Sequence, residues 1–328
     1  MPITGPTSYP PVVASFINHW TDANALLGSS PVTLNKDAIG AATDADITTL
    51  QALSGQLDFV RDTVATVALD LSILRAEGEA MKVDLHAKLN DFNSAVRADH
   101  PNSAYARVLP AVPSINEGRG RFLRPLRDAV KLWAKVNTYR TANGSGALVL
   151  KGGVNTGGFT DSVNSLALKY DAVEESEQQL SLEIQNRNDV QELIYPILRA
   201  YRAKLPTAFA AGSAIVTTLP ALSPSPGSTP AAPGLSGGYN AAMQRGDFAG
   251  VASTSSSVVK HQLRICLSAD YDTELEQVEA TITGAQPLTY TVTTGLGTPG
   301  SVISARLYAM TDDGHEAGSD AVVVSRPV

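Results

Sequence analysis

A long stretch in the first third of the chain decides the fold. Residues 44–100 read DADITTLQALSGQLDFVRDTVATVALDLSILRAEGEAMKVDLHAKLNDFNSAVRADH. Apolar side chains recur along it in steps of three and four, which is the heptad pattern of a helix and not the alternation of a strand. They are Leu50, Leu53, Leu57, Val60, Val64, Val67, Leu71, Leu74, Met81, Leu85, Phe92 and Val96. Because no proline interrupts the run before Pro101, the sequence predicts one helix from about Asp44 to His100.

Such a helix cannot bury its apolar seam against itself. At ~1.5 Å per residue it would be roughly 80 Å long, so it needs partners along its length. Gly78 stands on the seam where the next apolar residue is due. A glycine inside a helix costs ~1 kcal/mol relative to alanine. We therefore expect a bulky partner side chain to cross the helix closely at Gly78.

A second long helix is predicted over Phe159 to Leu205. Its apolar stripe has the same spacing, and Glu177 and Arg187 fall on the seam as polar layers that are either exposed or paired. Two shorter amphipathic helices, Pro10 to Leu27 and Gly120 to Tyr139, each precede one long helix.

The helical residues form a tandem repeat. Trp20 and Asn24 recur as Trp133 and Asn137, each pair four residues apart on a short helix. Three further short matches follow in the same order: residues 32–34 with 148–150, Arg97 and Pro101 with Arg202 and Pro206, and residues 109–112 with 219–222. The spacings are 113, 116, 105 and 110 residues. This pattern predicts two units, residues 10–118 and 119–222, that together make an elongated four-helix bundle.

The composition changes after the second unit. Residues 223–250 begin SPSPGSTPAAPG and predict a Pro/Ser/Gly-rich linker. Strand-like runs then follow near residues 258–267, 277–283, 288–293, 301–311 and 320–325. We therefore predict a multidomain α + β protein with an N-terminal arm at residues 1–9, the helical bundle, the linker, and a small antiparallel β-sandwich at residues 251–328.

The end of the chain resembles a fibronectin type III or related immunoglobulin-like domain. The residues that carry the resemblance are Ser304 to Met310, the turn Asp313-Gly314, Gly318 to Asp320, and Val322 to Ser325 before Pro327. The resemblance implies a binding or spacer module and brings no catalytic residue.

The bulk composition limits the partners. A formal charge of -7 argues against general binding to nucleic acids or to anionic membranes. Arg119, Arg121, Arg124 and Arg127 gather on one predicted helix, where we favour a solvated face over an anion site. No run of ~18 apolar residues predicts a membrane span, and the N-terminus lacks a signal-peptide pattern. We expect a cytoplasmic protein, and export to the cell surface by a non-classical route stays open.

The sequence predicts no catalytic, cofactor-binding or metal-binding residues. The single cysteine, Cys266, lies in a strand-like run and is expected to be buried and inert. No two of the five histidines have the spacing of metal ligands. Asp312, Asp313, His315 and Glu316 crowd a predicted hairpin tip, where we favour a solvated turn over an ion site. The glycine-rich residues 152–158 lack the Gly-Lys-Ser/Thr ending of a phosphate loop.

Three functions remain open. The first is a non-enzymatic structural or assembly protein, a helical stalk bearing a β-sandwich that self-associates into a homo-oligomer or filament. Two short helices cannot cover both long ones, so we expect the seam near Leu57 to Leu74 or Leu180 to Ile194 to meet another chain. The alternative is a monomeric or dimeric adaptor whose sandwich binds a protein or a glycan. The third is an enzyme with a site assembled between the domains.

Overall fold

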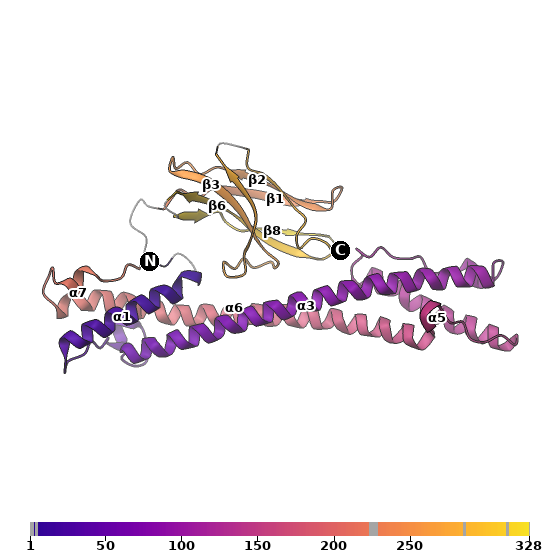
Figure 1. Cartoon of the computed structure of the whole chain (residues 1–328), viewed down its shortest axis with the longest axis horizontal. Coiled ribbons are helices and arrows are strands. Elements are labelled where there is room, and N and C mark those ends of the chain that lie inside the picture. The colour runs from indigo at the N-terminus through magenta and orange to yellow at the C-terminus, as the bar shows by residue number, and fades with distance from the viewer. Residues whose placement is uncertain (1–2, 4–5, 223–228, 285–286, 313–314, 328) are drawn as a thin grey trace.

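The computed structural model describes residues 3, 6–222, 229–284, 287–312 and 315–327. Two long helices form an extended rod, and a β-sandwich sits over its middle (Figure 1). The predicted arm, the first part of the predicted linker and the hairpin tip at Asp313-Gly314 lie wholly or partly outside these residues. The predicted combination of long helices followed by a C-terminal antiparallel β-sandwich is confirmed.

The four main helices begin and end within three residues of their predicted limits. They are α1 (Tyr9–Leu27), α3 (Ile47–Asp99), α5 (Arg119–Ala142) and α6 (Thr156–Ala208). Among the described residues, five short helical turns accompany them: η1 (Pro6–Ser8), α2 (Lys36–Ile39), α4 (Ala104–Arg107), η2 (Lys151–Gly153) and α7 (Ala214–Thr217).

The two long helices begin in the same way. Asp46 accepts a hydrogen bond from the backbone N–H of Thr49 at 3.0 Å, and Asn155 accepts one from Gly158 at 2.9 Å. Each side chain satisfies an amide that the first helical turn leaves without a partner. The caps are 109 residues apart, and both helices are 53 residues long. The long helices are therefore equivalent elements of the two repeats.

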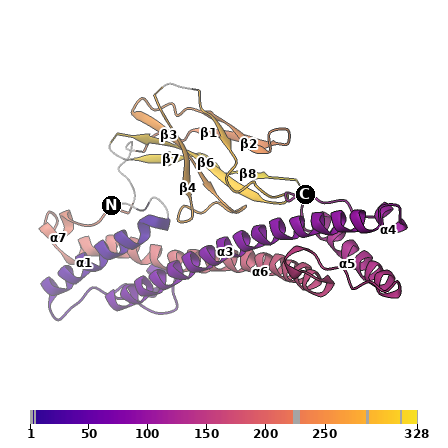
Figure 2. The ribbon, with the colours of Figure 1, turned by 45° about the vertical axis from the view of Figure 1, so that its right-hand side comes forward.

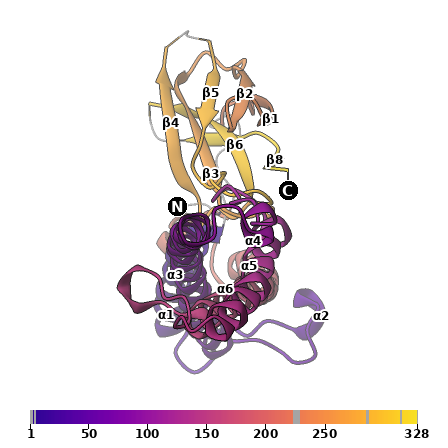
Figure 3. The ribbon, with the colours of Figure 1, turned by 90° about the vertical axis from the view of Figure 1, so that its right-hand side faces the viewer.

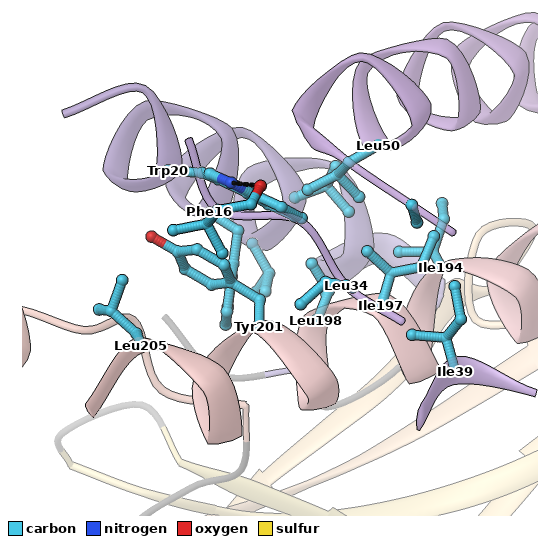
Figure 4. Packing of buried hydrophobic residues seen from close by; sticks show 14 of the residues in the cluster. Phe16, Trp20, Leu34, Ile39, Leu50, Ile194, Ile197, Leu198, Tyr201 and Leu205 are labelled. Carbon is cyan, nitrogen blue, oxygen red and sulfur yellow. Dashed lines mark hydrogen bonds between the residues drawn. The ribbon is translucent and has the colours of Figure 1, made fainter. Parts of the chain in front are cut away.

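Helices α3 and α6 run antiparallel, and each end of the rod has its own core. At one end, the start of α3 and the last turns of α6 bury α1, with Phe16 and Trp20 meeting Tyr201, Leu50 and Ile194 (Figure 4). At the other end, α5 fills the same place between the start of α6 and the last turns of α3. A pseudo-twofold axis thus crosses the middle of the rod and exchanges the two units (Figure 2).

The repeated residues make repeated contacts. The indole of Trp20 donates to the carbonyl of Val32 at 3.3 Å, and that of Trp133 donates to Leu148 at 3.2 Å. Asn24 accepts from the amide of Val32 at 2.9 Å. Asn137 accepts from the amide of Leu148 at 2.8 Å. Trp20 stacks on Tyr201, and Trp133 stacks on Phe92, with ring planes tilted by 23° and 24°. Each tryptophan therefore ties the segment after its short helix to the far end of the other unit's long helix.

One predicted match between the repeats is wrong. The sequence matches Arg97 with Arg202. In the structure Asn93 is the residue equivalent to Arg202, because the two lie 109 residues apart, as the two helix caps do, and make the same type of hydrogen bond. The amide of Asn93 donates to the carbonyl of Pro110, and the guanidinium of Arg202 donates to that of Pro220. A shared arginine misled the alignment because a different side chain makes the equivalent bond.

The sandwich consists of two antiparallel sheets. One has the order β1 (Gly234–Asn240), β2 (Arg245–Val251) and β5 (Thr289–Val292). The other has the order β4 (Gln277–Thr283), β3 (Val258–Cys266), β6 (Val302–Thr311) and β7 (Glu316–Gly318), with β8 (Val322–Ser325) also paired to β6. Their facing sides enclose one apolar core, which includes Phe248, Leu263, Ile265, Tyr290, Val292 and Leu307.

The linker prediction is wrong for residues 234–250, because these residues form β1 and β2. The strand Gly234–Asn240 reads GLSGGYN and has little apolar pattern of its own. It pairs with β2 over its whole length. A bulky neighbour also fills the space that Gly237 leaves, since a Cβ there would lie 2.3 Å from the ring of Phe248. The strand is therefore specified by its partner and not by its own composition.

The middle of the rod is covered by the sandwich of the same chain. Val64, Leu71 and Leu180 form a small cluster between the short-helix cores, and Leu275 of the sandwich packs against it. The long helices meet the sandwich on one side only (Figure 3). The sequence predicts that this part of the seam meets another chain, but Leu275 of the same chain packs against it, 95 residues after Leu180 and 204 residues after Leu71.

Candidate functional site

A buried charge network holds the sandwich on the rod. Arg187 of α6 donates to both carboxylate oxygens of Asp272, at 2.9 and 2.8 Å, and to Glu274 at 3.0 Å. Arg61 of α3 reaches the other oxygen of Glu274 at 2.6 Å. The side chains of Arg187 and Asp272 are each only 2% exposed. A buried charge is tolerated only when it is paired and hydrogen-bonded, so the network fixes the relative position of the two parts.

The loop between β3 and β4 is shaped to present these carboxylates. Asp272 accepts from the backbone N–H of Glu274 at 2.8 Å, which turns the loop so that Leu275 reaches the central cluster. The thiol of Cys266 donates to the backbone carbonyl of Asp272 at 3.1 Å. Burial raises the pKa of this thiol to about 11, so Cys266 is a thiol at neutral pH. Its predicted burial is confirmed.

The pseudo-twofold axis maps this contact onto an open cleft. The residues 109 positions away from Arg187 and Arg61 are Gly78 and Tyr170, and both line a cleft of about 790 Å³ between the rod and the sandwich. Loops at residues 267–270 and 295–302 form its sandwich wall. One half of the rod therefore holds the β3–β4 loop, and the equivalent half holds the cleft.

The cleft has an apolar floor and a charged rim. Leu71, Val173, Leu180 and Ile184 line its floor. On the rim, Arg75 pairs with Glu177 at 2.8 Å and also donates to the carbonyl of Leu267 at 3.2 Å. Apolar clefts of ~300–1,000 Å³ with a few polar groups are typical binding sites.

Tyr170 is the most perturbed group in the cleft. Burial raises its pKa to about 12, and the negative charge of Glu79 adds to the effect, while Arg119 opposes it. Its hydroxyl oxygen is buried and has no hydrogen-bond partner among the described residues. The group can therefore donate a hydrogen bond to a molecule in the cleft, but it does not supply a base at neutral pH.

The expected close approach at Gly78 is wrong. A Cβ there would meet only the Cγ of Lys169, at 3.6 Å, which is an ordinary contact. Within the described part of the chain, no bulky side chain crosses the helix there, and Gly78 lines the cleft instead.

Gly78→Ala should stabilise the protein by up to ~1 kcal/mol, because alanine restricts the unfolded chain and fits the helix. Urea unfolding followed by circular dichroism measures this. Gly55→Ala is the matched control, since a Cβ at Gly55 meets nothing within 4 Å. A loss of stability at Gly78 with a gain at Gly55 would show that the helix is crossed closely after all.

The other motifs from the sequence have structural partners. Glu316, from the predicted hairpin tip, accepts from Arg264 at 2.6 Å, and Asp313 lies outside the described residues. The glycine-rich stretch leads into α6, whose first turn is capped by Asn155. Both polar seam residues are paired, Glu177 with Arg75 and Arg187 with Asp272. Within the described residues, no group of three or more His, Cys, Asp or Glu side chains could hold a metal ion.

The sequence did not predict where the sandwich contacts the rod. Asp272 and Glu274 lie in a short acidic loop, which has no signature that points to an arginine 85 residues earlier. The available signal was the charge of Arg187, which together with Glu177 interrupts the apolar seam. In the described part of the chain, no helix has the length and apolar character needed to cross a membrane.

Comparison with known proteins adds partial matches only. No family model and no curated protein matches the chain. A fibronectin type III-like protein from Clostridium thermocellum is 22% identical over 31% of this chain and 97% of that chain, with a TM-score of 0.25. The pectate lyase PelI from Erwinia chrysanthemi, in complex with tetragalacturonic acid, is 13% identical over 28% of each chain, with a TM-score of 0.24.

A third match is the pectate lyase Pel3 from Pectobacterium carotovorum. It is 11% identical over 27% of this chain and 26% of that chain, with a TM-score of 0.23. This chain thus spans less than a third of either pectate lyase. At these identities and TM-scores the matches assign no activity to it.

Proposed function

We propose that the protein is a non-enzymatic structural protein, a helical rod that carries a docked fibronectin type III-like module and self-associates. The observation that carries this proposal is a set of exposed apolar side chains along both long helices. They are Phe59, Leu69, Ile73, Leu168, Leu182 and Leu193, and between 48% and 70% of each residue is exposed. We call these six residues the outer surface.

Four of the six residues of the outer surface follow the internal repeat. Phe59 and Leu168 are 109 residues apart, and so are Ile73 and Leu182, so each pair occupies equivalent positions on α3 and α6. Scattered exposed apolar residues are common, but a set repeated by the internal symmetry favours a contact surface.

The outer surface is turned away from the sandwich. Phe59 and Ile73 lie two residues before Arg61 and Arg75, which both contact the sandwich, so they point about 200° away around the helix. The sandwich covers the central seam but leaves this side open. Self-association is therefore expected on the outer surface instead of along the seam.

Sedimentation velocity tests this proposal. The wild-type chain should form species larger than a monomer at micromolar concentration, and Phe59→Ser with Leu168→Ser should sediment as a monomer. Leu26→Ser with Val108→Ser is the matched control, because these residues are 68% and 64% exposed but lie elsewhere. A wild-type chain that stays monomeric at high concentration contradicts self-association.

The cleft favours a second candidate, an adaptor that holds a ligand between the rod and the sandwich. Its apolar floor suits a protein segment better than a glycan. Gly78→Leu would project a branched side chain into the cleft, while Gly78→Ala adds only a methyl group. If capture of a partner is lost in the first variant and kept in the second, the adaptor function is supported. If both variants bind equally, the cleft is not the binding site.

A further inference from the structure

A row of basic side chains runs along the exposed side of α5. Arg121, Arg124, Lys131 and Lys135 are exposed, and their spacing of three, seven and four residues places them on one side of the helix. Arg127 is exposed beside them. Two of them have only long, exposed ion pairs, since Arg121 lies 3.8 Å from Glu117 and Lys131 lies 3.9 Å from Asp128. We call these five residues the basic face.

The outer surface carries the opposite charge. Asp62, Asp70, Glu175 and Asp189 are exposed among its apolar side chains. The only cations within residues 59–73 and 168–193 are Arg61, Lys169 and Arg187, which already pair with Glu274, Glu77 and Asp272. The outer surface is therefore apolar with an acidic border.

These charges decide how two copies meet. Two outer surfaces placed against each other would bring carboxylates together, and juxtaposed like charges at an interface cost several kcal/mol. The basic face offers the complementary charge, and both surfaces are exposed in one molecule. Contact between the two different surfaces is therefore favoured over contact between two identical ones.

The two surfaces cannot meet within one molecule. Helix α5 packs on the side of α6 that carries Leu166, and Leu168 lies about 200° further around that helix. Helix α5 also lies at one end of the rod, while the sandwich sits over its middle (Figure 1). The basic face is thus accessible to another copy and directed away from its own outer surface.

We propose that the basic face of one copy binds the outer surface of the next, which makes a head-to-tail filament. This inference rests on the proposed self-association and specifies its interface. Each copy offers one surface of each kind, so the contact is heterologous and does not close unless the rotation happens to do so.

Two charge-reversal variants test the pairing. Variant A carries Arg124→Glu and Lys131→Glu on α5, and variant B carries Asp62→Lys and Asp70→Lys on α3. Each variant alone should need at least about tenfold higher concentration for half-assembly, because each substituted position then faces charges of its own sign on the other surface. An equimolar mixture should assemble again, because the new glutamates on α5 of A then face the new lysines on α3 of B, and the unchanged surfaces of A and B still attract each other. Sedimentation velocity and negative-stain microscopy measure both effects.

The outcomes separate this inference from the function on which it rests. If wild-type protein is monomeric, self-association itself fails. If the wild type and variant A assemble equally well, self-association holds but the basic face is not its partner. If the mixture stays as poorly assembled as its components, the two surfaces do not pair. Recovery in the mixture also shows that both variants are folded.

Discussion

Arg187→Ala should release the sandwich from the rod and cost about 3–5 kcal/mol, the range measured when one partner of a buried ion pair is removed. The loss is large because Asp272, which is 2% exposed, would remain charged and buried without its partner. Arg75→Ala is the matched control. It removes a pair whose side chains are 37% and 48% exposed, so we expect a cost below ~1 kcal/mol.

Limited proteolysis reports on the release directly. The sequence predicts cleavage between Ser223 and Gly238. Because residues 234–238 belong to strand β1, we now expect the cut before Gly234. In the wild type the two pieces should elute together after cleavage, because the charge network and Leu275 still join them. In Arg187→Ala they should separate. Co-elution of the variant's pieces would show that the apolar contact is sufficient for docking.

Trp20→Ala should destabilise the helical part by about 3–5 kcal/mol, and Trp133→Ala should have a similar effect. Both indoles are fully buried, and each stacks on an aromatic ring at the end of the opposite long helix. The chain has only two tryptophans, so each variant keeps one indole as a fluorescent reporter at the other end of the rod.

The reporter shows whether the two ends unfold together. Because α3 and α6 run through both cores, we expect Trp20→Ala to shift the urea midpoint seen by Trp133 as much as the midpoint seen by circular dichroism. Trp20→Phe should lose less, since it retains an aromatic ring in the core. An unchanged Trp133 midpoint in Trp20→Ala would mean that the two cores are independent folding units.

Local sequence pattern was sufficient for the helices and for the repeat. The heptad spacing located α3 and α6 to within three residues. Cap residues begin both helices and Pro101 follows the end of α3, whereas α6 continues past Pro206 to Ala208. The match of Trp20 with Trp133 identified the two units. The match is meaningful because each indole donates the same hydrogen bond to the segment after its helix. Strands with strong apolar alternation, such as β3 and β6, were located equally well.

The features that the sequence did not reveal depend on distant partners. Strand β1 has a glycine-rich composition that indicates a linker until β2 lies beside it. The sequence did not predict that Leu275 packs against the seam near Leu71 and Leu180. The residues around Leu275 give no sign that its side chain points to the rod and not into the sandwich core. The cleft exists only where Gly78 replaces the equivalent of Arg187, so it required the three-dimensional alignment of the repeats.

The rod alone has nearly equivalent ends, because a pseudo-twofold rotation exchanges its two units. The single sandwich makes the two ends different. A duplicated platform offers a one-copy module two equivalent orientations, and nothing in the shared helical geometry distinguishes them. The difference between Gly78 and Arg187 removes that degeneracy, because only one half of the rod presents a cation to the acidic loop. The molecule consequently has a distinct head and tail, and any linear array of such molecules is polar, with two chemically different ends.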